Sequence, residues 1–387
     1  MNDPKINVQR LHDTLRECIR TPSPQPDMAA VRAFIVNVVQ PHLQDLPFDR
    51  LAVDDMGNLW GLLKGREQAN PFLLCTYAGT VPAANMPNAF EPRVVDGEAY
   101  GRPPGRYMWG RGTCEQMGGL AAALEAIRVY CEEGASRQRD VIFATTVAGE
   151  MGCHDAVAHL MNASRLNYGP TLFAIGTNNG ICVGNMGRID VEVEIRGQAC
   201  HSSNPTRGRN AIEGARQFLN ALREVPLPPP DPDLGQPSIT PTLIASSPTV
   251  SHTVPDFCRI VLDRRLIPGE EMSAALADIE ACRNKVSGLE VNVRGGRFNY
   301  PNKASLDSPL VRAATAALEA EGVAARCYYA RWTLDGGYFS RQGVDAILMG
   351  PGDESIAHTD AEMVRLSDVE AASRAYVRVL RAMASAA

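Results

Sequence analysis

Residues 72–76 read Phe-Leu-Leu-Cys-Thr, and a turn-like sequence at residues 77–82 follows this short apolar run. Two further runs of the same character lie at residues 141–147 and 172–175. Such runs are typical of strands that are buried on both faces of a sheet. Between the first two, residues 118–132 carry apolar side chains at helical spacing. This order predicts a mostly parallel sheet with crossover helices, an α/β fold.

The pattern changes after residue 183. Residues 189–195 alternate apolar with acidic side chains (Ile-Asp-Val-Glu-Val-Glu-Ile), which predicts a half-buried strand. The proline-rich stretch 226–248 is expected to be irregular, because proline interrupts helices and sheets. The remaining elements expected in this block are a helix at 211–223 and strands at 259–263 and 289–293.

After this block the first pattern returns. Residues 308–321 and 367–384 have helical spacing, and residues 346–349 again form a buried-type strand. We therefore predict one α/β domain made of residues 1–183 and 298–387. A small α+β domain, residues 184–297, interrupts it.

The composition narrows the classes of function. The chain has 387 residues, 45% of them hydrophobic and 21% charged, with a net charge of −6. No run of like charges stands out, which argues against nucleic acid as a partner, and no apolar stretch is long enough to span a membrane. Residues 1–20 lack the pattern of a signal peptide. The ten cysteines include no CxxC pair, so we expect reduced thiols and a cytoplasmic location.

Polar clusters follow the predicted strands, where open α/β sheets place their ligands. Together with matching segments in the middle block, they carry a resemblance. These stretches are Gly110-Arg111-Gly112 with Gly118-Gly119, His201-Ser202-Ser203 with Asn210-Ala211-Ile212, Val254-Pro255-Asp256 with Asp263-Arg264-Arg265, and Gly350-Pro351-Gly352 with Ala357-His358-Thr359.

The chain resembles the zinc-dependent family of acetylornithine deacetylase, succinyl-diaminopimelate desuccinylase, aminoacylase and carboxypeptidase-like dipeptidases. The resemblance implies a catalytic α/β domain that holds two metals, and an inserted lid that usually dimerises. It therefore implies a homodimer through the lid.

The departures from the family pattern affect the metal centre. The family's histidine and aspartate before Thr-Val-Pro fall on Tyr77 and Gly79. Its bridging aspartate falls on Glu115, its general base on Gly149, and the adjacent glutamate ligand on Glu150. The last two ligands fall near Thr177-Asn178 and on His358.

Sorting these positions by metal separates two half-sites. One half-site would need Tyr77, Glu115 and the Thr177 position, and most of these cannot serve as ordinary ligands. The other would use Glu115, Glu150 and His358, a competent set of two carboxylates and one imidazole. We expect at most one divalent metal (zinc, manganese or cobalt). The alternative is no metal, with these three side chains as an inherited polar cluster.

Gly149 leaves the reaction without the usual base. Amide hydrolysis needs a group that takes a proton from water and passes it to the leaving nitrogen. The substitutes are Tyr77, Cys114, His154 and Asp335. Cys114 precedes Glu115 near a helix start, which can activate a thiol, but a buried filler is the preferred interpretation. Asp335 could instead cap the backbone amides of a turn. Tyr77, Glu150 and His201 are the predicted catalytic residues.

The resemblance also assigns roles to residues of the lid. His201 would help to hold the substrate's oxyanion, and Arg265 would grip a substrate carboxylate with its bidentate guanidinium. His252 and Asn210 match further positions near the substrate. Each of these four residues could also serve only the local stability of the lid. Asp335, which lies outside the lid, is counted with the predicted substrate-binding residues.

These features predict an amidohydrolase-like enzyme that acts on a small, carboxylate-bearing N-acyl or N-carbamoyl amino acid. Two alternatives stay open. The scaffold could run a metal-independent reaction, such as a lyase, isomerase or acyl-transfer step. It could also be a ligand-binding pseudoenzyme.

Overall fold

The computed structural model describes residues 3–67, 69–149, 153–165 and 167–385. The chain divides into two compact units. Unit 1 comprises residues 1–185, 302–330 and 334–387, and unit 2 comprises residues 186–301 and 331–333. Unit 2 corresponds to the insert that the sequence predicts at residues 184–297.

Unit 1 is built on one large sheet with the strand order β1-β2-β6-β3-β7-β17-β8-β15, with β16 also paired to β8. The strands are β1 (Arg50–Val53), β2 (Leu59–Leu63), β3 (Phe72–Tyr77), β6 (Val141–Thr146), β7 (Thr171–Phe173), β8 (Ile181–Asn185), β15 (Asn302–Lys303), β16 (Cys327–Ala330) and β17 (Ala346–Met349). Its centre, β6-β3-β7-β17, is parallel, whereas β1, β2 and β15 pair antiparallel. The predicted α/β class with a mostly parallel sheet is confirmed.

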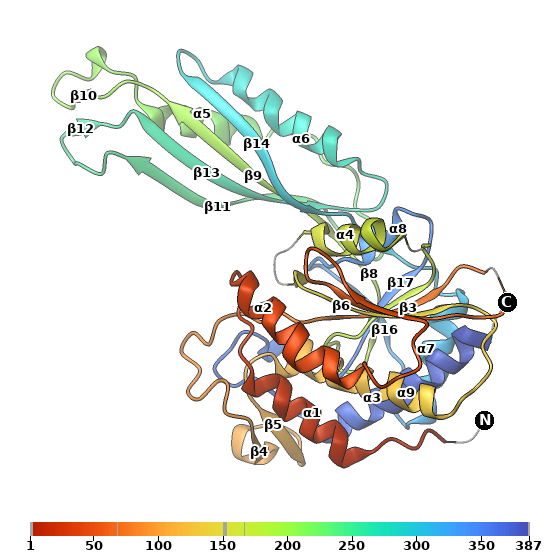
Figure 1. Cartoon of the computed structure of the whole chain (residues 1–387). Helices are drawn as coiled ribbons and strands as arrows, with labels where there is room; N and C mark the ends of the chain where they lie inside the picture. The colour runs from red at the N-terminus through yellow and green to blue at the C-terminus, as the bar shows by residue number, and fades with distance from the viewer. Residues whose placement is uncertain (1–2, 68, 150–152, 166, 386–387) are drawn as a thin grey trace. The chain divides into compact units, whose positions relative to one another are not determined.

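Helices cover both faces of this sheet, as Figure 1 shows. On one face lie α1 (Val8–Arg20), α3 (Gly118–Glu132), α7 (Pro309–Ala320) and α9 (Leu366–Ser385), and on the other lie α4 (Asp155–Ser164) and α8 (Gly336–Ser340). The central strands are buried along their whole length, as expected for strands packed on both faces. Smaller elements of unit 1 are α2 (Met28–Phe34) and the sheet β18-β5-β4, formed by Met363–Arg365, Arg106–Trp109 and Arg93–Asp96.

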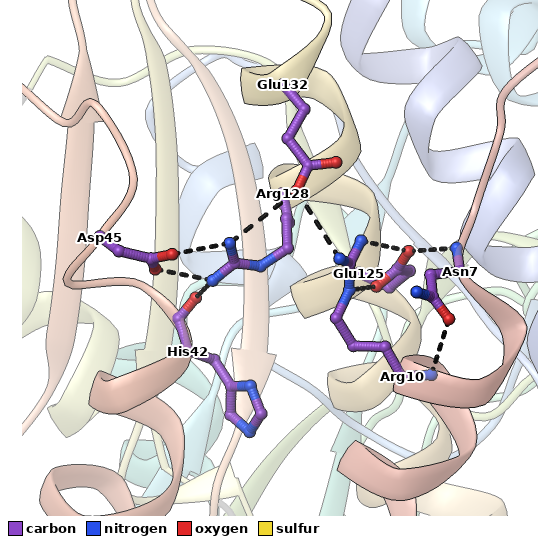
Figure 2. Close-up of polar contacts among 7 residues, drawn as sticks. All are labelled: Asn7, Arg10, His42, Asp45, Glu125, Arg128 and Glu132. Carbon is purple, nitrogen blue, oxygen red and sulfur yellow. Dashed lines mark hydrogen bonds and ion pairs between the residues drawn. The ribbon is translucent and has the colours of Figure 1, made fainter.

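Helix α3 anchors the N-terminal helix through charged side chains (Figure 2). Glu125 is 3% exposed, and it accepts hydrogen bonds from the backbone N of Asn7 at 2.6 Å and from Nε of Arg10 at 2.6 Å. Nearby on α3, Arg128 donates to both carboxylate oxygens of Asp45, at 2.7 and 2.9 Å. Because a buried carboxylate is costly without partners, these bonds fix the start of the chain against α3.

Unit 2 is a four-stranded sheet in the order β11-β13-β9-β14 with two helices on one face (Figure 1). Its elements are β9 (Gly187–Arg196), β10 (Cys200–His201), α5 (Ala211–Leu222), β11 (Ser238–Ser247), β12 (Thr253–Val254), β13 (Phe257–Leu266), α6 (Met272–Ala281) and β14 (Glu290–Asn299). The alternation predicted for residues 189–195 is confirmed, since every second side chain of β9 is buried under the helices.

The prediction that residues 226–248 are irregular was wrong for β11, which pairs with β13 over its whole length. Proline is tolerated here because β11 is an edge strand, and the register shifts between Pro241 and Leu243. The edge position of β11 therefore accommodates proline, which a central strand would exclude.

Two further findings concern the cysteines and the possibility of a membrane span. All ten cysteines are free thiols. Among the described residues, no helix has the length and apolar character needed to cross a bilayer.

Candidate functional site

Tyr77 is the last residue of β3, at the carboxyl end of a central parallel strand. Its ring stacks on Phe173 of β7, with centroids 5.9 Å apart and planes 6° apart. The side chain is 1% exposed, and its hydroxyl donates to Oδ2 of Asp335 at 3.1 Å. Burial, followed by the nearby charge of Asp335, raises the pKa of Tyr77 well above its usual value. Tyr77 is therefore a neutral hydrogen-bond donor.

Asp335 joins Tyr77 to a second buried side chain. Its other oxygen, Oδ1, lies 3.0 Å from Nδ1 of His154, which immediately precedes α4. Asp335 and His154 are each 3% exposed. Asp335 precedes α8, but its side chain makes no capping bond there. The alternative of a turn carboxylate that caps backbone amides is therefore wrong, because both carboxylate oxygens face side-chain donors.

Two glycines of this region leave room for neighbouring side chains. A Cβ atom at Gly149 would lie 2.6 Å from Cγ of Tyr77, which is closer than non-bonded carbon atoms approach. A Cβ at Gly79 would lie 2.8 Å from Cγ of Gln25, whose amide donates to the carbonyl of Val147. Bulky side chains thus occupy the space that side chains at positions 79 and 149 would need.

The third position of the same half-site is Thr177. Its hydroxyl donates to the carbonyl of Gly180 at 2.7 Å and accepts from the backbone N of Gly350 at 3.0 Å. On this half of the rim Tyr77 and Thr177 thus have hydrogen-bond partners of their own, and neither is a carboxylate or an imidazole, the side chains that usually bind a divalent ion.

The other half of the rim has a different character. Glu115 lies in a single π-helical turn, Thr113–Met117, that leads into α3, and His358 lies in the loop after β17. Nε2 of His358 is 2.7 Å from Oε2 of Glu115. The side chains are 50% and 26% exposed, respectively. His358 has a φ of 64°, an unusual conformation for a residue with a side chain.

The predicted third ligand, Glu150, lies outside the described residues. Within the described ranges, no group of three or more His, Cys, Asp or Glu side chains could hold a metal ion. Glu115 and His358 are nevertheless chemically suited to a divalent cation, since carboxylate and imidazole are common zinc ligands. Glu115 and His358 are therefore two candidate ligands for one ion, and Glu150 stays the predicted third.

A buried ion pair connects the segments that carry Glu115 and His358. Arg111 and Glu362 are each 1% exposed, and their side chains meet at 2.8 Å. Glu362 also accepts from the backbone N of Cys114 at 3.2 Å, and Arg111 donates to the carbonyl of Thr359 at 3.2 Å. Burial raises the pKa of Glu362. Because Cys114 and Thr359 adjoin the two candidate ligands, this pair fixes the loops that position them.

Cys114 itself is fully buried. Burial, together with the charges of Glu362 and Glu115, raises the pKa of its thiol well above the usual value. A thiol is nucleophilic as the thiolate, so the burial and raised pKa of Cys114 favour the buried-filler interpretation over an activated thiol.

The predicted binding residues of unit 2 fall into two groups. His201 and His252 lie together, with ring centroids 5.7 Å apart, on the short β10–β12 ribbon. Nδ1 of His201 lies 2.8 Å from Oγ of Ser203 and accepts from the backbone N of Ser203 at 3.2 Å, so Nε2 carries the proton in the neutral ring. Both histidines are exposed.

The other two residues have structural partners. Asn210 caps α5, because its side-chain oxygen accepts from the backbone N of Ile212 at 2.9 Å. Arg265 grips both oxygens of Asp263, at 2.7 and 3.0 Å, and donates to the carbonyl of Arg331 at 3.2 Å. The guanidinium of Arg265 is thus engaged within unit 2, and a substrate carboxylate would have to compete with Asp263.

The chain thus combines an α/β unit, whose loops carry the candidate ligands, with an inserted α+β unit. A model of peptidase family M20/M25/M40 matches residues 80–382, and the chain belongs to this family. The predicted resemblance is thereby confirmed.

Relatives and solved structures agree with this assignment. Escherichia coli YgeY is 25% identical over an alignment of 403 positions, which covers 94% of this chain and 92% of YgeY. The acetylornithine deacetylase of Myxococcus xanthus is 28% identical over 274 residues, 68% of this chain and 69% of the relative. An M20 family metallo-carboxypeptidase of Sulfolobus solfataricus shares the fold, with a TM-score of 0.79 at 16% identity over 96% of this chain and 99% of that one.

The sequence named Tyr77, His154 and Asp335 as separate substitutes for the base, with Tyr77 also a predicted catalytic residue and Asp335 a predicted substrate-binding residue, but it did not predict that they meet. It also missed the Arg111–Glu362 pair. The Gly336-Gly337 pair after Asp335 is a weak signal of close packing at that turn. No local signal relates Arg111 to Glu362, which is 251 positions away.

Proposed function

We propose that this protein is an amidohydrolase-like enzyme that acts on a small N-acyl or N-carbamoyl amino acid or a related peptide-like amide. Membership of the M20/M25/M40 family supports a hydrolase of amide or peptide bonds. The observation that carries the proposal is the 2.7 Å contact between Glu115 and His358, two ligand-type side chains that stay accessible at the edge of a parallel sheet.

The enzyme would use at most one divalent metal, zinc, manganese or cobalt, held by Glu115, Glu150 and His358. When bound, such an ion polarises a carbonyl group and acidifies bound water. The chemistry of Tyr77 and Thr177 argues against a second ion. His201, His252, Asn210 and Arg265 are proposed to contact a carboxylate-bearing substrate.

Metal analysis and a substrate panel test this function. Protein purified without chelator is expected to hold no more than one equivalent of metal. With zinc, manganese or cobalt added, it should cleave at least one of N-acetyl-L-ornithine, N-succinyl-L-diaminopimelate, N-carbamoyl-L-alanine and glycyl-L-alanine. The variant His358→Ala should lose both the metal and at least about 100-fold in kcat/KM, because removing a ligand costs more than removing its supporting partner.

A matched control is His42→Ala, which removes another accessible histidine of unit 1. His42 also pairs with a glutamate, with Nε2 3.0 Å from Oε2 of Glu17. This variant should keep the metal and the turnover. Two full equivalents of metal, or no amide cleavage with any of the three ions, would contradict the proposal.

We also propose that unit 2 forms a homodimer. Strand β11 ends the four-stranded sheet, and its apolar side chains Leu243 and Ile244 are 43% and 58% exposed. An exposed apolar edge strand is a template for pairing with another chain. Light scattering should therefore report a dimer for the wild type and a monomer for Ile244→Lys. A monomeric wild type at micromolar concentration would refute the dimer.

A second function has one specific observation in its favour. The ring of Tyr77 fills the space beside Gly149, where relatives would hold a base. This packing favours a metal-independent, non-hydrolytic reaction or a ligand-binding pseudoenzyme. Calorimetry that shows binding of N-acetyl-L-ornithine, with no turnover at any metal concentration, would favour this second function over hydrolysis.

A further inference from the structure

Unit 1 contains a small cavity beside β5, with a volume of about 180 Å³, which we call the Tyr107 cavity. Glu115 and His358 are not among the residues that line it. A protein cavity of about 150 Å³ can hold one benzene molecule, so the Tyr107 cavity has room for a ligand of about that size. Four charged side chains line it: Arg102, Asp353, Arg365 and Asp368.

The hydroxyl of Tyr107, in the wall of this cavity, has no hydrogen-bond partner among the described residues. Tyr107 belongs to β5 and is 7% exposed. All four charges of the cavity act on this hydroxyl, which therefore lies close to them. Burial raises the pKa of Tyr107, so the group stays protonated and can both donate and accept. Because buried polar groups normally have partners, a ligand in the cavity would supply the missing one.

Two of the four charged side chains satisfy each other. Nη1 of Arg102 lies 2.9 Å from Oδ2 of Asp353. The other oxygen of Asp353 accepts from the backbone N of Ser355 at 2.9 Å. This pair is neutral as a unit, so the remaining two charges decide which ligand the cavity favours.

Arg365 and Asp368 form no ion pair with each other or with any other described residue. Nη2 of Arg365 donates to the carbonyl of Pro104 at 2.6 Å, and the guanidinium has further N–H groups. Asp368 has one weak partner, the hydroxyl of Ser367 at 3.4 Å. Burial raises the pKa of Asp368, and the charge of Arg365 opposes this only in part. The cavity therefore presents one cation and one anion, each without a counter-ion.

We propose that the Tyr107 cavity binds a small zwitterionic amino acid with an uncharged side chain. The carboxylate of the ligand accepts hydrogen bonds from Arg365 and Tyr107, and its ammonium group donates to Asp368. A zwitterion satisfies both charges at once, whereas a simple anion or cation would leave one of them unpaired in a partly buried place. L-Alanine has as many non-hydrogen atoms as benzene, so it matches the volume.

The Tyr107 cavity shares a wall with the loop that carries His358. Gly352, Asp353 and Ile356 line the cavity, and His358 follows Ile356 by two positions. A ligand in the cavity therefore stabilises this loop, since ligands stabilise the state that binds them. The amino-acid site goes beyond the proposed hydrolase function and does not depend on it.

Calorimetry of the full chain tests the site. We expect one L-alanine per chain with a Kd of about 1 mM or lower. Propionate and ethylammonium, which each keep one charge of L-alanine, should bind at least about tenfold more weakly.

Two variants test the contacts. Asp368→Asn should weaken L-alanine binding at least about tenfold, because it removes the charged acceptor. Tyr107→Phe should weaken it about threefold to tenfold. The thermal midpoint of the free Tyr107→Phe variant should equal that of the wild type, because the hydroxyl has no protein partner to lose.

The matched control is Tyr328→Phe. The hydroxyl of Tyr328 is also buried without a partner among the described residues, but Tyr328 does not line the cavity, so the affinity for L-alanine should stay at the wild-type value. His358→Ala should keep this affinity too, which separates the cavity from the candidate metal site. Hydrogen exchange of the wild type should slow at residues 102–107 and 352–356 when L-alanine is added.

No binding of L-alanine at about 10 mM would overturn the proposal. So would an affinity that is unchanged in both Asp368→Asn and Tyr107→Phe or lost in His358→Ala, since the ligand would then bind elsewhere. Equal binding of propionate would overturn the assignment of a zwitterion. If L-alanine binds as expected while the wild type cleaves nothing in the substrate panel, the hydrolase function fails and the amino-acid site stands.

Discussion

The two halves of the rim of unit 1 differ in their relation to solvent. On one side, Tyr77 and Asp335 are at most 3% exposed and hydrogen-bonded to each other. On the other, the side chains of Glu115 and His358 are 26% and 50% exposed, although they too are in contact. A buried polar contact stabilises a fold mainly because its loss leaves unpaired groups, whereas an exposed pair contributes little. The first half has therefore become part of the core, and the second remains available to ligands.

The largest effect is expected for Asp335→Ala. It removes the acceptor of two buried donors at once, and each unpaired donor costs about 1–3 kcal/mol, so unfolding should require about 2–6 kcal/mol less free energy. Urea denaturation followed by fluorescence measures this loss. Arg102→Ala, which breaks the partly exposed pair with Asp353, should cost less than about 1 kcal/mol. Equal losses in the two variants would erase the distinction between a buried and an exposed half.

The next effect concerns the contact between Gly149 and Tyr77. Gly149→Ala places a methyl group 2.6 Å from the Tyr77 ring, and such overpacking costs about 1–3 kcal/mol. In a Tyr77→Ala background the same substitution should cost less, because the ring is gone. Denaturation of the four members of this double-mutant cycle checks the coupling. Additive losses would show that the ring does not restrict residue 149.

A smaller effect, of about 1–2 kcal/mol at pH 7, is expected for Tyr77→Phe, which leaves one oxygen of Asp335 without its donor. Stability measurements at alkaline pH test whether this loss comes from the Tyr77 hydroxyl. Tyr77 keeps its proton in the folded state above pH 10, where an unfolded tyrosine loses it. The stability of the wild type should therefore fall with rising pH by about 1.4 kcal/mol per unit more than that of the variant. Parallel curves above pH 10 would contradict a raised pKa.

The smallest effect is expected for His358→Ala in the absence of added metal, below about 0.5 kcal/mol, because exposed ion pairs contribute little. The same urea experiment measures it. With zinc added, the wild type should gain stability and the variant should not, since ligands stabilise the state that binds them. A metal-free loss as large as that of Asp335→Ala would place His358 in the core as well.

The strands of the parallel sheet could be predicted because their signal is local. Residues 72–76, 141–147 and 346–349 each form a strand, as β3, β6 and β17. The edge strand β11 was missed, because prolines mask its pattern and pairing with β13 overrides the local preference.

The site could be predicted only in part, for a physical reason. Motif positions identified Glu115 and His358, and the structure brings them together. The bond between Tyr77 and Asp335 depends instead on how the residue before α8 meets the end of β3, since the two residues are 258 positions apart. Packing of this kind leaves no periodic signal in the sequence.

The Arg111–Glu362 pair joins the segments next to Glu115 and His358 through protein contacts alone. The frame that this pair provides does not involve the residues at positions 77 and 149. Over evolutionary time, substitutions at those two positions can change the chemistry of the rim while this frame persists. The same frame makes the chain a practical starting point for laboratory evolution toward new hydrolytic or non-hydrolytic reactions.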